Sequence, residues 1–346
     1  MCVGSYISGN GIYQKLYSAP GDRMSGVSAV APTSGMSAIL EGSHGGMLSA
    51  AGTAAAENAI SSETLRAYDR ALRQVTELLA GRLMEDENLS EVLSEMAADG
   101  AGRAKLGQIV AAVRFRARLA GRSDPVGPSC DAVLKAHRRA TPPSRQVAAV
   151  DWDQADAAAA LAASAGDLRG LRNAAIIATM SDAMLRVGEV TALKVGDIDH
   201  RRDGAATLTI RRSKTDQYGD GAALYLGIPT TLRIQTWMEA ADFAGTDMTD
   251  GPLFRRILRG EHASAEPLSP RSIREIVRSA AAAVGIDGAS GHSLRIGSAM
   301  SLVRVGASLI ETQQAGRWAS PVMPAHYARN EMVARGAVAR LRYPTA

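Results

Sequence analysis

Apolar residues recur at helical spacing once the chain passes about residue 60. The first clear case is a helix predicted at 63–79, whose apolar positions share one face: Leu65, Tyr68, Leu72, Val75 and Leu79. The same kind of spacing predicts helices at about 89–98, 104–121 and 129–138. Residues 61–140 are therefore expected to form a small helical domain.

The segments on either side of this domain lack such a pattern. Residues 1–60 are rich in Gly, Ser, Ala and Met, and they show no sustained helical or strand period. We expect a low-complexity, disordered tail there. Pro142 and Pro143 disfavour a helix after residue 140, so residues 141–150 are expected to be a linker.

From residue 151 to residue 346 the helical pattern returns. Helices are predicted at about 153–164, 168–182, 187–194, 230–242, 270–284, 292–305, 308–315, 320–329 and 332–341. Alternating stretches at 207–210 and 222–228 predict two antiparallel strands, joined by a loop that contains Gly219 and Gly221. The expected fold class is mostly α with a small antiparallel sheet, an α+β domain following an all-α one.

Composition narrows the class of protein. A chain of 346 residues with 46% hydrophobic residues is long enough for about two domains with real cores. Cys2 and Cys130 alone cannot build a disulfide scaffold or a Cys-based zinc site. No apolar run approaches the ~20 residues that cross a bilayer, and the first residues do not resemble a signal peptide. We therefore expect an intracellular protein with no membrane partner.

The charges point weakly to nucleic acid. The net charge is only +4, but all except five of the 39 cations are Arg, whose planar fork matches phosphate oxygens. Four of these arginines lie in the helix predicted at 104–121 or directly after it, and their spacing does not allow all four to share one face. The candidate DNA-binding residues are Arg114, Arg116, Arg118, Arg122, Arg145 in the linker and Arg271 at the start of the 270–284 helix.

Three groups of residues suggest phosphate chemistry. His292 and Arg295 lie one turn apart at a helix start, and they form either a phosphate cradle, since free N–H groups there already favour an anion, or an ordinary surface pair. Arg186 and Glu189 form either a local ion pair or a pair in which Glu189 aims Arg186 at a phosphate. Lys214, on the predicted hairpin, is either solvated or able to reach a leaving oxygen.

Two aromatic residues follow in the same order along the chain. Trp318 can donate its indole N–H to an oxyanion, although a Trp between helices is usually a core residue. Tyr327 is a poor nucleophile at its usual pKa near ~10, but beside cations or a base it could attack phosphorus.

Taken together and in order, these motifs resemble the tyrosine recombinase (phage integrase) family, and most of all its Cre-type recombinases. The similarity covers about residues 104–341. It rests on Leu106-Gly-Gln108, Leu171-Arg-Asn173, Arg211-Arg-Ser-Lys-Thr215, Gln314-Ala-Gly-Arg-Trp318, Tyr327-Ala-Arg-Asn330 and Val338-Ala-Arg-Leu341. It is weaker before residue 104, so no base-reading residue is assigned.

The resemblance implies a role for each matching residue. Arg186, His292 and Arg295 would grip the scissile phosphate, with Trp318 adding a hydrogen bond. Glu189 would orient Arg186, and Lys214 would protonate the departing 5′-hydroxyl oxygen. Tyr327 would be the nucleophile, leaving a 3′-phosphotyrosyl link. No metal, ATP or other cofactor would be needed.

The resemblance also implies a fold and an assembly. Residues 61–140 would be the helical, SAM-like core-binding domain, and residues 151–346 the catalytic domain. Four copies would act on two double-stranded DNA sites with inverted repeats, through a four-way junction. The final segment, 331–341, is a candidate helix for docking into a neighbouring copy, and the alternative is packing on its own domain. A cytoplasmic, nucleoid-associated location follows, and the need for a directionality factor stays open.

Two other functions share this constellation. One is a type IB-like topoisomerase or a telomere resolvase, which would use the same residues on DNA. The other is a catalytically inactive DNA-binding protein that keeps the fold and uses the site for phosphate contact alone.

Overall fold

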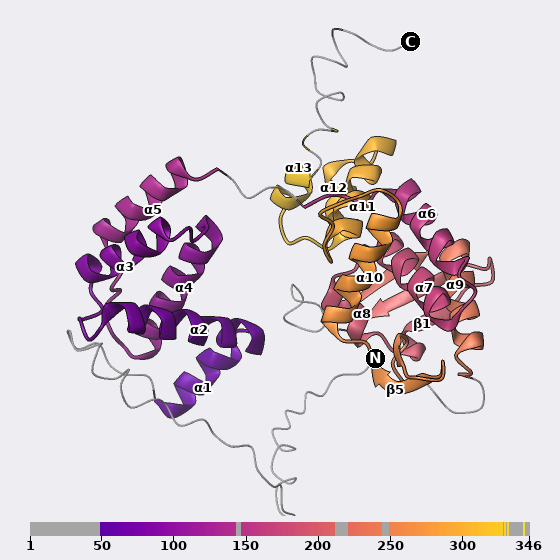
Figure 1. Ribbon diagram of the computed structural model, residues 1–346, viewed down its shortest axis with the longest axis horizontal. Coiled ribbons are helices and arrows are strands. Elements are labelled where there is room, and N and C mark those ends of the chain that lie inside the picture. The colour runs from indigo at the N-terminus through magenta and orange to yellow at the C-terminus, as the bar shows by residue number, and fades with distance from the viewer. Residues whose placement is uncertain are drawn as a thin grey trace, which may run out of the picture. The chain divides into compact units, whose positions relative to one another are not determined.

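The computed structural model describes residues 49–142, 147–211, 221–243 and 249–327, together with Arg329, Glu331 and Arg342. The chain divides into two compact units, and the division lies between residues 144 and 145 (Figure 1). Each unit has its own hydrophobic core. Among the described residues, no helix is long and apolar enough to cross a membrane.

In its described residues, 49–142, the first unit is all-helical. Its helices are α1 (Ala50–Asn58), α2 (Ser62–Leu79), α3 (Asp86–Ala98), α4 (Arg103–Leu119) and α5 (Pro128–Ala140). The apolar face predicted for α2 is confirmed in part, because Leu72, Val75 and Leu79 are buried. They pack with Leu89 and Leu93 of α3 and with residues of α4 and α5.

Helix α1 differs from the expectation for residues 1–60. Residues 50–58 form a helix, although they show no apolar face, while residues 1–48 lie outside the described part of the chain. The Ser49 side chain caps α1 by accepting a hydrogen bond from the backbone N–H of Gly52. Arg116 of α4 pairs with Glu57 of α1 at 3.5 Å, a long-range contact that sequence spacing does not reveal.

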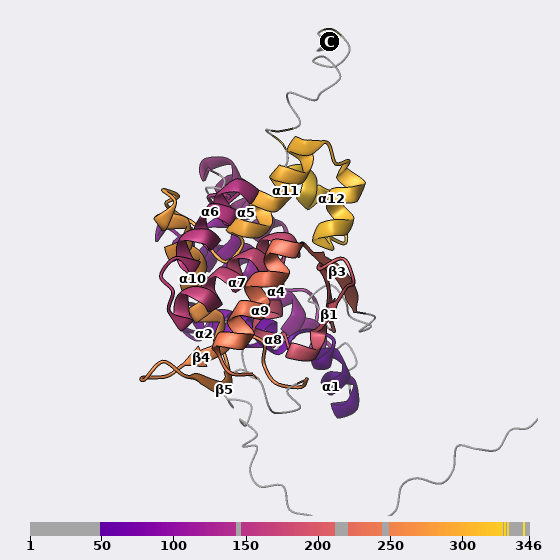
Figure 2. The same ribbon diagram turned by 90° about the vertical axis from the view of Figure 1, so that its right-hand side faces the viewer.

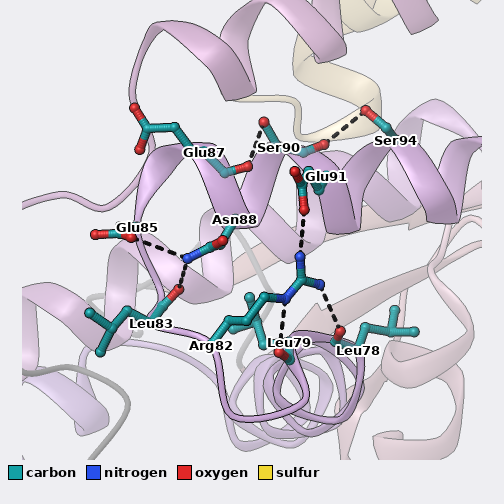
Figure 3. A network of polar contacts seen from close by, with 10 residues as sticks. All are labelled: Leu78, Leu79, Arg82, Leu83, Glu85, Glu87, Asn88, Ser90, Glu91 and Ser94. Atoms are coloured by element: carbon teal, nitrogen blue, oxygen red, sulfur yellow. Dashed lines mark hydrogen bonds and ion pairs between the residues drawn. The ribbon is translucent and has the colours of Figure 1, made fainter.

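Arg82 links the end of α2 to α3 (Figure 3). Its Nε donates to the carbonyl of Leu79 at 3.0 Å and its Nη2 to that of Leu78 at 3.1 Å. Its Nη1 pairs with Glu91 of α3. Since the last carbonyls of a helix have no partner within it, one guanidinium both caps α2 and fixes the next helix.

Asp86 joins α3 to α5. Its carboxylate accepts hydrogen bonds from the backbone N–H groups of Gly127, Ser129 and Cys130, at 2.7–3.0 Å. Desolvation raises the pKa of Asp86, but the N–H of Cys130 and then that of Ser129 outweigh it, and the net pKa is well below its usual value. The carboxylate thus replaces the side-chain cap that α5 lacks.

We expect Asp86→Ala to weaken the first unit by about 1–3 kcal/mol, because three N–H groups lose an ionised acceptor. Hydrogen exchange in α3 and α5 of the full chain measures this loss. Since the folded pKa is lowered, the contribution is present above the unfolded value near ~4 and is lost as the pH falls towards the folded one. Glu87→Ala, an exposed neighbour, is the control, and equal exchange in both variants would contradict the assignment.

The second unit is mostly helical with two small antiparallel sheets, as the sequence predicts for its class. Its helices are α6 (Trp152–Ala163), α7 (Leu168–Asp182), α8 (Val187–Ala192), α9 (Ile228–Ala240), α10 (Pro270–Ala283), α11 (Ser293–Val305), α12 (Leu309–Gly316) and α13 (Val322–Tyr327), with a 3₁₀ turn at Val195–Asp197. Helices α11, α12 and α13 pack together (Figure 1 and Figure 2). The helix predicted at 332–341 lies outside the described residues.

The larger sheet has the order β1-β2-β3, with β1 (Ile198–His200), β2 (Ala206–Ile210) and β3 (Ala222–Leu226). Strands β2 and β3 are the predicted pair, and Leu208 lies opposite Leu224. The sequence prediction missed β1 and also a second sheet, β4 (Arg255–Ile257) with β5 (Ala263–Pro267). These strands are short, and β5 is largely exposed, so they give no alternating pattern.

The start of the second unit is fastened to α11. The backbone N–H of Val150 donates to the carbonyl of Ser293 at 3.1 Å, and that of Trp152 donates to Ser301 Oγ at 3.2 Å. Gly297 faces this crossing, where a Cβ would lie 1.7 Å from the carbonyl oxygen of Val150. Only a residue without a side chain fits, and this close approach holds α11 against α6 and α7.

Candidate active site

The corner between α7 and α8 places the first pair of candidate residues. Met184 has a positive φ of 47°, which turns the chain so that α8 begins directly after Arg186. Glu189, one turn into α8, accepts the backbone N–H of Arg186 at 2.8 Å. Its other oxygen accepts Arg186 Nη1, also at 2.8 Å. One carboxylate therefore caps the helix and holds the guanidinium.

Glu189 has a second cationic partner. Arg317, at the end of α12, donates from Nη2 to Glu189 Oε2 at 2.8 Å, and the Glu189 side chain is 5% exposed. Burial raises the pKa of Glu189, but Arg317 and the N–H donors of Arg186 outweigh it, so the net pKa is lowered. Glu189 is ionised at neutral pH.

His292 and Arg295 take different environments. His292 is the N-cap residue of α11 and is exposed, whereas Arg295 is 3% exposed. Arg295 donates from Nη1 to the carbonyl of Met184 and from Nη2 to that of Gly316. It thereby ties α11 to the α7–α8 corner and to the end of α12.

Arg295 stays cationic at neutral pH. Burial lowers its pKa to about 9, and the nearby Arg186 and Arg317 cations act in the same direction. The guanidinium groups of Arg186, Arg295 and Arg317 repel one another, and a bound anion would relieve that repulsion.

The aromatic pair lies next to Arg295. The Arg295 guanidinium stands 4.4 Å from the ring centre of Trp318, a cation–π contact, and the rings of Trp318 and Tyr327 are 6.0 Å apart. Burial raises the pKa of the Tyr327 phenol, against the opposing effect of Arg295. The phenol is therefore protonated at neutral pH, within a short chain of contacts from the buried cations.

The structure thus forms two contact groups, Arg186 with Glu189 and Arg295 with Trp318 and Tyr327. They are joined through Arg317, which binds Glu189 and shares the Met184 carbonyl with Arg295, and His292 lies at the start of the same helix as Arg295. Such an arrangement, cations around a phenol, is suited to a phosphate group and an attacking oxygen. Lys214 and Arg145 lie outside the described residues. Within the described part of the chain, no three His, Cys, Asp or Glu side chains gather as a metal site.

Comparison with known proteins identifies the family. A family model described as the phage integrase family matches residues 151–333, which is more than half of the chain. The chain belongs to the phage integrase family.

Two curated relatives of this phage integrase chain are recombinases. Recombinase cre of Escherichia phage P1 is 27% identical over 210 residues, which are 57% of this chain and 61% of cre. Tyrosine recombinase XerC of Corynebacterium glutamicum is 30% identical over 156 residues, 44% of this chain and 45% of XerC. The matches therefore span about half to three fifths of these relatives' lengths.

Solved structures share the fold of this phage integrase chain. XerH recombinase bound to a palindromic difH substrate has a TM-score of 0.58 at 15% identity, covering 79% of this chain and 78% of XerH. A lambda integrase dimer bound to a COC′ core site has a TM-score of 0.54 at 18% identity, covering 78% and 89%. The mostly helical fold with small sheets, predicted from the sequence, is confirmed.

Three of the candidate DNA-binding arginines of the first unit have side-chain partners within that unit. Arg114 pairs with Asp124 at 2.8 Å, and Arg116 with both Glu57 and Asp69. Arg118 Nε donates to the carbonyl of Arg114, and the backbone N–H of Arg122 donates to that of Ala117. Arg271, on α10 of the second unit, is exposed. Their contacts with DNA stay a prediction.

Arg317 is the site residue that sequence reasoning left without a role. It was visible between Gly316 and Trp318, but its partner Glu189 is 128 positions away. No spacing rule connects two such residues, so only the packing of α12 on the α7–α8 corner brings them together.

We expect Gly316→Ala to reduce chemistry at Tyr327 by about 100-fold, because displacing reacting groups by about 1 Å has that order of effect. A Cβ at position 316 would lie 1.8 Å from Trp318 Cζ3, so the indole and then Tyr327 must move. Covalent capture of DNA measures the loss. Gly188→Ala, where a Cβ meets nothing within 4 Å, is the control, and wild-type capture by Gly316→Ala would contradict the packing argument.

Proposed function

We propose that this chain is a site-specific DNA recombinase that cuts and rejoins DNA through a covalent 3′-phosphotyrosyl intermediate. The observation that carries the proposal is the contact chain Arg295–Trp318–Tyr327, which sets a nucleophile beside a buried cation. Membership of the phage integrase family supports it, as do the recombinase names of the relatives.

In this mechanism the arginines bind the scissile phosphate. Arg186 and Arg295, with His292 at the start of α11, donate to its non-bridging oxygens and stabilise the added negative charge of the transition state. Each Nη of Arg295 keeps a second N–H for this purpose, since only one is used on each carbonyl. Trp318 supplies a further donor from its indole N–H.

The bond changes balance without an added reactant. Tyr327 Oη forms a bond to phosphorus, and the bond from phosphorus to the 5′ oxygen breaks. The phenol gives its proton to solvent water, and Lys214 gives one to the departing 5′ oxygen and regains it from solvent. Attack by a 5′-hydroxyl on the phosphotyrosine then reverses the step and reseals the strand, so neither ATP nor a metal ion is required.

The DNA partner is proposed to be duplex with an inverted-repeat site, bound by four copies of the chain. Support comes from XerH bound to a palindromic substrate and from the lambda integrase dimer on its core site, which share this fold. The first unit, as the core-binding domain, and the second, as the catalytic domain, would both hold the duplex across the 141–150 linker. A cytoplasmic, nucleoid-associated location accompanies this proposal.

An exposed apolar surface supports assembly. Val305, Ile310, Val322 and Met323, on α11, α12 and α13, are 39–70% exposed. We propose that this surface receives the 331–341 segment of a neighbouring copy. Glu331 begins that segment and pairs with Arg304 at 3.2 Å.

Tyr327→Phe tests the chemistry. The purified full chain is incubated with nicked, sheared genomic DNA, the reaction is stopped with SDS, and covalently attached DNA is sequenced. We expect one inverted-repeat site to be enriched with the wild type and lost with Tyr327→Phe, while duplex affinity is unchanged. Tyr225→Phe, an exposed residue of β3, is the control and should keep the adducts.

Two other results of this experiment would indicate a different function. Scattered adducts without a preferred site would indicate a topoisomerase. Intact duplex binding with no adduct from the wild type would indicate a catalytically inactive DNA-binding protein.

Removing residues after Asn330 tests the assembly. We expect the shortened chain to bind a single site as a monomer but to lose recombination between two sites, because the docking segment is gone. Gel-filtration of DNA complexes and a two-site recombination assay measure both. Recombination at the full-length rate would contradict docking by this segment.

A further inference from the structure

Arg317 occupies a position that its backbone disfavours. It ends α12 in the left-handed region, with φ 53° and ψ 47°, although it has a side chain. That conformation costs roughly 1 kcal/mol for a residue other than glycine. Contacts of the Arg317 side chain must offset this backbone cost.

The side chain is directed into the site and not into solvent. It is 11% exposed, and its Nη2 lies 2.8 Å from Glu189 Oε2 and 3.5 Å from the carbonyl of Met184. Glu189 Oε1 holds Arg186 Nη1 at 2.8 Å. The two arginines therefore grip one carboxylate from different elements, α12 and the start of α8.

This geometry restrains the orientation of the Arg186 guanidinium. Both oxygens of Glu189 accept hydrogen bonds from Arg186, Oε1 from Nη1 and Oε2 from the backbone N–H, at 2.8 Å each. Arg317 adds a third donor, at Oε2 and from the end of α12, so the carboxylate and the guanidinium bound to it are also restrained from a different helix before any phosphate arrives.

We propose that Arg317 is a positioning residue for strand cleavage, which holds Glu189 and through it orients Arg186 towards the phosphate. The proposal rests on the proposed recombinase function and deepens it. Arg317 acts through Glu189 and touches no reacting atom. A merely structural role, in which Arg317 only fastens α12, makes different predictions.

The first measurement is single-turnover cleavage at saturating DNA, with the full chain and a nicked duplex carrying the captured site. We expect Arg317→Gln to slow cleavage by about 10- to 100-fold while DNA affinity changes by less than about 3-fold. Arg317→Lys should recover part of the rate, because an ammonium can still reach Glu189. Arg201→Gln, which removes an exposed arginine between β1 and β2, is the charge-matched control.

A double-variant comparison separates positioning from structure. If Arg317 acts through Glu189, Arg317→Gln should slow a Glu189→Gln enzyme by less than about 2-fold. A rate equal to the wild type for Arg317→Gln, or losses that multiply in the double variant, would overturn the proposal.

The second measurement needs no cleavage. In nitrogen-15 NMR spectra of the DNA-free chain, the Arg186 side-chain N–H signal is assigned with Arg186→Lys. We expect that signal to be protected from solvent exchange in the wild type and to lose protection in Arg317→Gln, but not in Arg201→Gln. Unchanged protection would overturn the proposal. Absence of Tyr327-dependent adducts would instead refute the recombinase function, and this spectrum would still decide the role of Arg317.

Discussion

The carboxylate of Glu189, buried between two guanidinium groups, is the interaction on which the site depends. It is the anion that allows Arg186, Arg295 and Arg317 to gather in one place before a phosphate binds. Removing one partner from a buried ion pair leaves an uncompensated charge, which costs about 3–5 kcal/mol. The fold around Glu189 must therefore bring the three guanidinium groups and the carboxylate together as one group.

Two unusual backbone positions bring these charged groups together. Met184 and Arg317 both have a positive φ without being glycine, one at the α7–α8 corner and the other at the end of α12. The first turns the chain so that the Met184 carbonyl faces Arg295, and the second sends the Arg317 side chain towards Glu189. Strained turns of this kind persist only where surrounding contacts determine them, and they gather at functional sites. Here the contacts are the hydrogen bonds of the arginines themselves.

The sequence predicted those features that local patterns encode. The helix at 168–182 matches α7 because its apolar period is long, and Arg186 with Glu189 was recognised as a pair because the two lie one turn apart. The order of the motifs gave the family, which the comparisons confirm. Features that depend on distant residues were missed. Helix α1 has no apolar face and is held by Ser49 and Arg116, while β4 is too short to alternate and β5 is largely exposed. The role of Arg317 was missed because its partner lies in another helix.

The acidic partners of the α4 arginines alter how duplex binding is to be understood. Arg114 and Arg116 already face Asp124, Glu57 and Asp69, so a phosphate that approaches them competes with carboxylates and does not simply displace dissolved ions. In the proposed DNA complex, binding would exchange one anion for another, and hydration of the freed carboxylates would offset part of the entropy gained by releasing condensed cations from the duplex. These ion pairs would thus lower the attraction of the first unit for arbitrary duplex, because a phosphate must compete with a carboxylate for each arginine.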